Sequence, residues 1–564
     1  MDDLVGNAAV DYKGLLAIRS KTGGWLSNAL IVGIEVSERL STMGIAVNLV
    51  TYLIGRMHIP SATSAKIVSD FMGTSFLLCL LGGLIADSFL GRYRTIAIFA
   101  IIQTLGTGML AISSMLPQLQ PTPCNIHYSL KSSNCEQATT SQMSVLYISL
   151  YLMALGTGGL KSSVSGFCTD QFDETNEEEK AQLTLFFNWF FFFITLGTLL
   201  AVTVLVYIQD EVGRSCGYGI CSFSMLVAIL MFLSGTKRYR YKKTMKSPIA
   251  QILHVLIAAI RKRRLQLPTN DSFLYEDNSN SSRISHTDQF RILDKAAIMT
   301  KEDYECINSL AENPWRISSV TKVEEVKMII RLLPIWTTSI LFWTAYAQLV
   351  TFSVEQASTM DRSIGDFRIP AASLTAFFVS AILISLATYD RLILPFLKIW
   401  TAKKSGLTSL QKIGIGLFLS CLGMGVASII EVKRLSIAKE NEETPNTLPI
   451  SVFLLIPQFF LVGAGVGFMY TGQLDLFITQ SPKGMKTMST GLFLTTMALG
   501  FFFSSLLISI VKKVTTANIN NGWVGESINK GRLDCFYGLL AILIFIDFGF
   551  YVLCASWYTS NIIC

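Results

Sequence analysis

The sequence predicts an all-α polytopic membrane protein, with about twelve transmembrane helices in two six-helix bundles. Of the 564 residues, 51% are hydrophobic and only 15% are charged, whereas a soluble chain carries about 25% charged residues. The apolar residues form runs long enough to cross a bilayer, which takes about 20 helical residues. A polar stretch of about 90 residues separates these runs into two sets of six.

The predicted spans alternate with polar loops. The first six cover residues 25–54, 67–87, 95–116, 141–166, 184–208 and 217–236. The second six cover residues 327–353, 369–394, 409–431, 450–474, 487–511 and 534–558. We therefore expect four regions: an N-terminal segment (1–24), a first bundle (25–236), a linker (237–326) and a second bundle (327–564).

Basic residues indicate the orientation of the spans. Arg92 and Arg94 lie between spans 2 and 3, and six Lys or Arg residues lie within 237–246, after span 6. The positive-inside rule places these loops, the linker and both termini in the cytoplasm. A second basic run, 261–264, follows the periodic apolar stretch 249–260, which predicts an amphipathic helix on the membrane surface. The net charge of +7 therefore indicates a lipid bilayer as partner, and no nucleic acid.

Span 1 contains an unusual group of charges, Glu35-Val-Ser-Glu38-Arg39. Each ionised side chain near the bilayer centre costs about 2.5–3.5 kcal/mol on insertion scales. Glu35 and Arg39 are four residues apart with the acid first, which is the favourable order for a helical ion pair, and Glu38 shares their face. Two carboxylates beside one guanidinium favour sharing or exchange of a proton. The pattern predicts a proton site; the alternative is a structural cluster that locks this helix to its neighbours.

Span 4 contains one lysine, Lys161. The next charged residue is Asp170, nine positions on, or roughly 14 Å along a helix. A lysine in a span either extends its side chain to the membrane surface or faces a cavity inside the bundle. We expect Lys161 to face a central cavity.

The loop between spans 2 and 3 reads Gly83-Leu-Ile-Ala-Asp87-Ser-Phe-Leu-Gly91-Arg92-Tyr-Arg94. Its glycines permit a tight cytoplasmic turn, while Asp87 and Arg92 are suited to clamping neighbouring helix ends. We expect a cytoplasmic gating loop made by Gly83, Asp87, Gly91 and Arg92. Thr95 follows these arginines, and a phosphate there would meet both a helix N-terminus and basic side chains. Thr95 is therefore a candidate site for a regulatory kinase, or else an ordinary capping threonine.

The gating loop resembles the signature loop of the major facilitator superfamily, and its Ala86–Arg92 form is similar to the proton-dependent oligopeptide transporter family. Further motifs point to the same family: Glu35–Arg39, Gly156-Thr-Gly-Gly-Leu-Lys161 and Phe190–Thr198. Four others resemble its plant nitrate/peptide branch: Lys21-Thr-Gly-Gly-Trp25, Cys135-Glu-Gln, Asp170-Gln-Phe-Asp173 and Tyr470-Thr-Gly-Gln-Leu-Asp475. The resemblance covers nearly the whole chain and is closest to the nitrate-transporting members.

The resemblance implies a fold of the major facilitator type and a proton-coupled symporter that imports nitrate by alternating access. It also implies a multi-pass protein of the plant plasma membrane, active in nitrate assimilation, without cofactor or metal. The family's proton-coupling motif maps onto Glu35, Glu38 and Arg39, and its helix-4 lysine maps onto Lys161.

Two positions depart from the family pattern. Span 10 usually carries a glutamate where this chain has Val466, and without it the ammonium group of a peptide would lack a carboxylate partner. In span 7, the best-characterised nitrate carriers offer a histidine, whereas this chain has Tyr346 and Gln348, which donate hydrogen bonds but bring no charge. We therefore expect Arg39 and Lys161 to form the positive floor of an anion site, with Tyr346 and Gln348 orienting the substrate.

Two alternatives remain open. The substrate could be another organic anion, such as a plant hormone or a glucoside, or the protein could be a membrane sensor that binds nitrate and signals through the linker. An enzyme is not expected, because none of the four histidines lies near a nucleophile motif and no phosphate-binding glycine loop occurs. Cys124 and Cys135 share one polar loop and would be able to form a disulfide if that loop faces outside.

Overall fold

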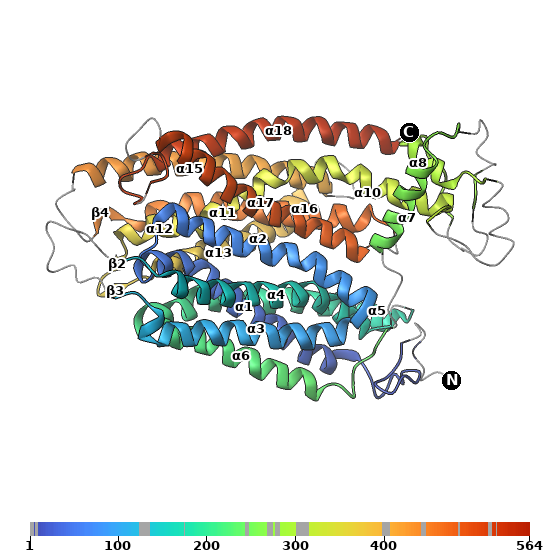
Figure 1. Ribbon diagram of the computed structural model, residues 1–564, viewed down its shortest axis with the longest axis horizontal. Helices are drawn as coiled ribbons and strands as arrows, with labels where there is room; N and C mark the ends of the chain where they lie inside the picture. The colour runs from blue at the N-terminus through green and yellow to red at the C-terminus, as the bar shows by residue number, and fades with distance from the viewer. Residues whose placement is uncertain are drawn as a thin grey trace.

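Long apolar helices lying side by side make up most of the molecule (Figure 1). The computed structural model describes residues 5, 9–122, 136–173, 175–242, 248–267, 274–276, 283–300, 315–396, 406–440, 447–482, 486–516, 522–525 and 527–563. Cys124 and Cys135, the candidate disulfide, lie outside these described residues.

Six helices form the first half of the chain. Their bounds are α1 Gly24–Gly55, α2 Ser61–Ile85, α3 Arg92–Met115, α4 Thr140–Asp170, α5 Glu177–Leu200 and α6 Arg214–Ser234. Wider π-helical turns continue α2 through Ala86–Leu90 and α5 through Ala201–Leu205 and Ile208–Val212. Such turns often mark functional positions in helices.

The second half begins with a broken span. The bounds are α10 Val320–Thr338, α11 Ile340–Val350, α12 Phe352–Thr359, α13 Thr375–Thr388 (extended by Tyr389–Ile393), α15 Ser409–Glu440, α16 Ile456–Thr479, α17 Lys486–Thr516 and α18 Leu533–Ile563. In the described part of the chain, four short strands lie at one end: β1 Met360–Asp361, β2 Ser363–Ile364, β3 Phe367–Arg368 and β4 Leu448–Ser451. Strand β1 pairs with β4 in parallel and β2 pairs with β3 antiparallel.

Among the described residues, ten helices are long and apolar enough to cross a membrane, and a bent pair supplies an eleventh span. The bent span joins α10 to α11 and α12 at an angle of 45°. Helix α1 is a further long helix of 32 residues, but it carries the charges of Glu35, Glu38 and Arg39. These helices confirm the predicted all-α membrane fold.

Glycines bring the central helices of the first half close together. A Cβ atom added to Gly82 of α2 would lie 2.7 Å from the carbonyl oxygen of Gly158, and one added to Gly159 would overlap the ring of Phe99 on α3. Small residues permit this close approach of membrane helices. The close packing places Lys161, which follows these glycines on α4, near the centre of the molecule.

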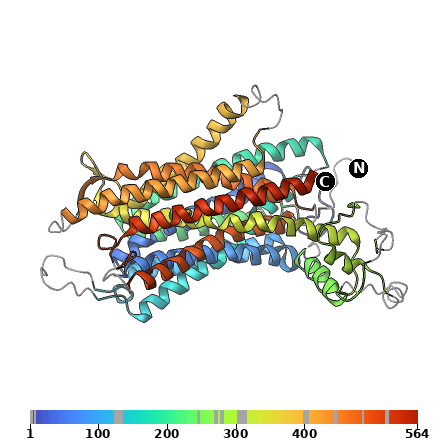
Figure 2. The same cartoon turned by 90° about the horizontal axis from the view of Figure 1, so that it is seen from above.

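The linker lies at the same end of the molecule as both termini (Figure 1, Figure 2). It includes α7 Pro248–Arg261 and the short helix α8 Arg291–Asp294. The apolar side of α7, with Val255 and Ala258, packs against Ala297 and Val323. Protein therefore covers much of the face that we expected to lie on the membrane, although Ile260 remains exposed.

Candidate functional site

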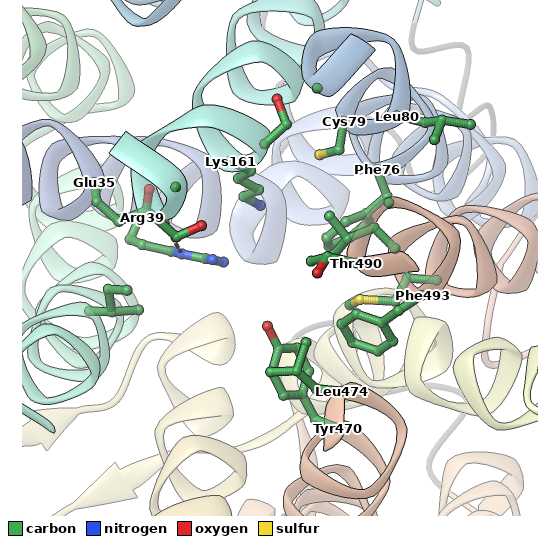
Figure 3. Close-up of a pocket in the computed structure, with 18 of the residues that line it drawn as sticks. Glu35, Arg39, Phe76, Cys79, Leu80, Lys161, Tyr470, Leu474, Thr490 and Phe493 are labelled. Atoms are coloured by element: carbon green, nitrogen blue, oxygen red, sulfur yellow. Dashed lines mark ion pairs between the residues drawn. The ribbon is translucent and has the colours of Figure 1, made fainter. Parts of the chain in front are cut away.

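A central cavity of about 810 Å³ lies between the two halves. Its walls come from α1, α2, α4 and α5 of the first half and from α11, α13, α16 and α17 of the second (Figure 3). The lining continues to Asp87, Arg92 and Lys242, which belong to the end that carries the linker. The cavity therefore reaches from the middle of the molecule to the linker end.

The three charged side chains of α1 form one group at the cavity wall. Arg39 Nε lies 3.3 Å from Glu35 Oε1 and 3.7 Å from Glu38 Oε2. Glu35 and Arg39 line the cavity. Glu38 lies behind them and is fully buried. The helical spacing that the sequence showed thus brings the three charges together, but only two of them face the cavity.

Lys161 of α4 joins this group from the side. Its Nζ lies 3.6 Å from Glu38 Oε1 and 4.7 Å from the centre of the Phe76 ring. The amine points into the cavity rather than toward a membrane surface (Figure 3). Two cations and two carboxylates therefore meet within a few ångströms in a region where charge is costly.

The cavity wall of the second half is neutral where it faces these charges. Tyr346 of α11 lines it, packed against Phe378 at 5.4 Å and Phe501 at 5.8 Å between ring centres. Val466 and Tyr470, one helical turn apart on α16, also line it. The hydroxyl of Tyr470 points into the cavity from the side opposite Arg39 (Figure 3).

Gln348 does not take the position that we expected from the sequence. Its side chain is fully buried, and its Nε2 donates to the carbonyl of Thr344 at 3.0 Å and to Ser504 Oγ at 2.9 Å. It is not among the residues that line the described cavity. A two-residue step from Tyr346 turns the side chain about 200° around the helix, so Gln348 faces α17 and cannot orient a substrate in this conformation.

Two aromatic residues of the site were not predicted from the sequence. Phe76 lies beside Lys161 and stacks on Phe501 of the second half, with ring centres 6.0 Å apart. Tyr470 belongs to one of the plant-branch motifs, but the motif alone assigned it no role. Tyr470 lies four residues after Val466, and residues at i and i+4 share a helix face. This spacing was the sequence signal that Tyr470 lies on the same side of the helix as Val466.

The gating loop forms an ion-pair cluster at the linker end. Arg92 lies 3.4 Å from Asp87 and 2.8 Å from Asp170 of α4. Lys242, at the start of the linker, lies 3.2 Å from the same Asp170. Gly91 has a φ of 76°, a conformation that favours glycine, and it turns the chain directly into α3. Gly83 lines the cavity one helical turn before Asp87.

Thr95 is fully buried in this conformation. Its Oγ1 donates to the carbonyl of Gly91 at 3.0 Å, within the first turn of α3. A kinase would reach this hydroxyl only after the start of α3 had moved away from its neighbours.

At the opposite end, a hydrogen bond joins the two halves. Ser61, the first residue of α2, donates its hydroxyl to Glu355 Oε2 of α12 at 2.5 Å. Both side chains are buried. Ring stacking of Tyr207 on Phe367, at 5.8 Å, adds a second contact between the halves. The cavity is thus open toward the linker end, and the halves meet at the other.

One group of side chains has the ligand types of a metal site. His286, Asp294 and Glu324 bring ligand atoms within 4.8 Å of one another. However, the ammonium of Lys327 lies 2.7 Å from Asp294 and 2.8 Å from Glu324. This lysine supplies the positive charge that a metal ion would bring, so the group is an ion-pair cluster fixing the linker to α10.

The all-α membrane fold and a charged central cavity open at one end define a membrane carrier. A family model described as the POT family matches residues 93–524. The chain is 64% identical to Protein NRT1/PTR FAMILY 6.2 of Arabidopsis thaliana, with 98% of this chain and 94% of that protein covered. It is 52% identical to Protein NRT1/PTR FAMILY 6.3 of the same plant, covering 99% and 95%.

Solved structures show the same fold. The crystal structure of the POT family transporter PepTSo matches with a TM-score of 0.67 at 20% identity, over 95% of this chain and 98% of that chain. An auto-inhibited POT family peptide transporter matches with a TM-score of 0.66 at 20% identity, over 95% and 96%. The chain belongs to the POT family, in its plant NRT1/PTR branch. It is a transporter and not an enzyme.

Proposed function

We propose that this transporter is a proton-coupled symporter that imports nitrate by alternating access. The observation that carries the proposal is the pairing of two cations, Arg39 and Lys161, at a cavity whose facing wall is neutral. Stripping water from an anion is costly, and charge-assisted hydrogen bonds from two cations offset much of that cost. Tyr346 contributes a further donor from the second half.

The carboxylates supply the coupling. Glu35 lines the cavity beside Arg39, and Glu38 lies between Arg39 and Lys161. While both acids are ionised, they compete with an incoming anion for the two cations. A proton on either acid leaves more positive charge for the anion, so binding of proton and anion is mutually favourable.

The neutral wall also supports an anion rather than a peptide. Val466 occupies the position at which the family usually has a glutamate, and no described cavity residue of the second half is acidic. The ammonium group of a peptide would therefore meet the two cations without a facing carboxylate. A second candidate remains a larger organic anion, because a cavity of about 810 Å³ falls within the range of pockets for drug-sized ligands, about 300–1,000 Å³.

We further propose that the linker end faces the cytoplasm of a plant cell and that the protein acts in the plasma membrane. The support is the gathering of basic loops at the end where both termini lie (Figure 1). Phosphorylation of Thr95 is proposed for a conformation in which the start of α3 is exposed. Mass spectrometry of protein from native tissue tests it, and Thr95 unmodified at every nitrate supply would count against it.

Two substitutions test the anion site. Lys161→Ala should lose nitrate transport, because one of two cations is removed. Val466→Glu should weaken apparent nitrate affinity, because a carboxylate opposite the cations draws Lys161 away from the substrate. Saturation curves of labelled nitrate uptake in oocytes, normalised to surface protein, give both results. Lys66→Ala, which removes an exposed lysine of α2, is the matched control.

Unchanged apparent affinity in Lys161→Ala would show that the lysine is structural and that the anion site lies elsewhere. Acid-dependent currents with a larger organic anion, but none with nitrate, would favour the second candidate.

A further inference from the structure

A chain of buried polar side chains continues behind the cavity from Glu38. Thr42, one helical turn along α1, donates its hydroxyl to Glu38 Oε1 at 2.8 Å. Thr157 Oγ1 of α4 lies 3.0 Å from Thr42 Oγ1, and Gln103 Nε2 of α3 lies 3.4 Å from it. All of these side chains are fully buried, in the interior of the first half.

The direction of each hydrogen bond around Thr42 follows from the number of protons that its hydroxyl carries. A threonine hydroxyl has one proton to donate and two lone pairs that accept. The proton of Thr42 goes to Glu38, so Thr157 and Gln103 must both act as donors to Thr42. Three helices therefore orient one hydroxyl toward one carboxylate oxygen.

This hydroxyl is the closest donor to Glu38. The two cations lie farther from the carboxylate, Lys161 at 3.6 Å and Arg39 at 3.7 Å. The second oxygen of Glu38 has no hydrogen-bond partner among the described residues. Within the described part of the chain, Thr42 thus makes the only contact to the Glu38 carboxylate at hydrogen-bond distance.

We propose that Thr42 is a positioning residue for proton coupling. Its hydroxyl, oriented by Thr157 and Gln103, fixes the Glu38 carboxylate behind the cavity and stabilises its ionised form through a charge-assisted hydrogen bond. This inference rests on the proposed function, since it concerns the same group of charges, and it adds a role for residues that do not face the cavity.

Other charged or titratable groups also surround Glu38. They are Glu35 and Arg39 on α1, Lys161 on α4 and Cys79 on α2, with Tyr346 and Tyr470 facing Arg39 from the second half. Removing the Thr42 hydroxyl leaves all of them in place. Because a charge-assisted hydrogen bond is about twice as strong as a neutral one, the loss destabilises the carboxylate more than the protonated acid.

The test follows the protonation of Glu38 without any substrate. Full-length protein in lipid nanodiscs is titrated with pH by infrared difference spectroscopy, and Glu38→Gln identifies the band of the protonated Glu38 carboxyl. Thr42→Val should move the midpoint of that band by about one pH unit. Thr42→Ser, which keeps the hydroxyl, should restore it. Thr157→Val, which removes a donor to Thr42, should give a smaller shift in the same direction.

Thr107→Val is the matched control. Thr107 is also fully buried in the first half, but among the described residues its hydroxyl donates to backbone carbonyls of its own helix alone. An unchanged midpoint in both Thr42→Val and Thr157→Val, or an equal shift in the Thr107 control, would overturn the assignment. Absence of nitrate uptake by the unmodified protein would overturn the proposed function instead, because the infrared titration needs no nitrate.

Discussion

At the level of single residues, the two acids of α1 differ in their surroundings although they are three positions apart. Glu35 lines the cavity, whereas Glu38 is fully buried and receives a hydroxyl from Thr42. Lys161 lies 3.6 Å from Glu38, so Glu38 is the acid that links α1 to α4. Glu35 therefore meets the cavity directly, whereas Glu38 contacts both Arg39 and Lys161 behind it.

Replacing Glu38 tests this link. Glu38→Gln should abolish uptake driven by an acid exterior. The side chain that contacts both Arg39 and Lys161 then no longer takes up or releases a proton. Surface expression should stay near normal, since glutamine keeps the shape and an acceptor for Thr42. Uptake at several external pH values with surface biotinylation measures both, and Glu177→Gln, whose carboxylate is highly exposed, is the control. Full acid-stimulated uptake would exclude Glu38 as an essential proton carrier.

At the level of whole helices, the contact of α2 with α4 determines where Lys161 lies. Gly82 has no space for a side chain, since an added Cβ would come within 2.7 Å of the carbonyl of Gly158. The neighbouring Gly83 does have space, with the nearest atom at 3.6 Å. The two adjacent glycines thus differ in what they contribute to the packing.

This difference gives a matched pair of substitutions. Gly82→Ala should destabilise the protein by about 1–3 kcal/mol, the usual cost of overpacking, because two of the three atoms that lie 2.7 Å from the new Cβ belong to the backbone of α4. Gly83→Ala should have little effect on stability. Thermal unfolding of the purified protein in detergent compares the two. An equal melting temperature for both variants would contradict the close contact of Gly82 with α4.

At the level of the entire molecule, the cavity is open at the linker end while Ser61 and Glu355 join the halves at the other end. Glu355 forms no ion pair with the described residues, and it accepts the hydroxyl at the very start of α2. A carboxylate at a helix N-terminus is favourable because the dipole there is positive. An exchange between inward-open and outward-open states, as the proposed alternating access requires, would have to break this contact.

Removing the hydroxyl should therefore favour the state that opens at the far end. Ser61→Ala should raise the outward-open population up to about tenfold, as expected from the loss of a hydrogen bond worth about 0.5–1.5 kcal/mol. Spin labels at Val212 and Ile364, exposed residues of the first and second halves, would report a longer distance. Ser64→Ala removes a buried hydroxyl that donates to the carbonyl of Ile59, and it should leave the distances unchanged. Identical distance distributions for both variants would show that Ser61 does not hold the halves together.

Local patterns in the chain were enough to predict which segments cross the membrane and which charges lie inside them. Span length depends on a run of about 20 apolar residues, and the pairing of Glu35 with Arg39 depends only on the i and i+4 geometry of one helix. Both properties are local, so they can be read from neighbouring residues. The cavity position expected for Lys161 followed in the same way, from the cost of a charge in a span.

Contacts between helices, in contrast, determine the rotation of each helix about its own axis and the residues that it packs against. Gln348 and Tyr346 lie on one helix, yet Tyr346 faces the cavity and Gln348 faces Ser504, because the rotation of α11 is set by its contacts with α17. The position of Tyr470 opposite Arg39 likewise depends on residues far apart in the chain that meet across the two halves. The same holds for the hydrogen bond from Ser61 to Glu355. Such contacts are fixed by packing between helices, which no periodicity within a single helix encodes.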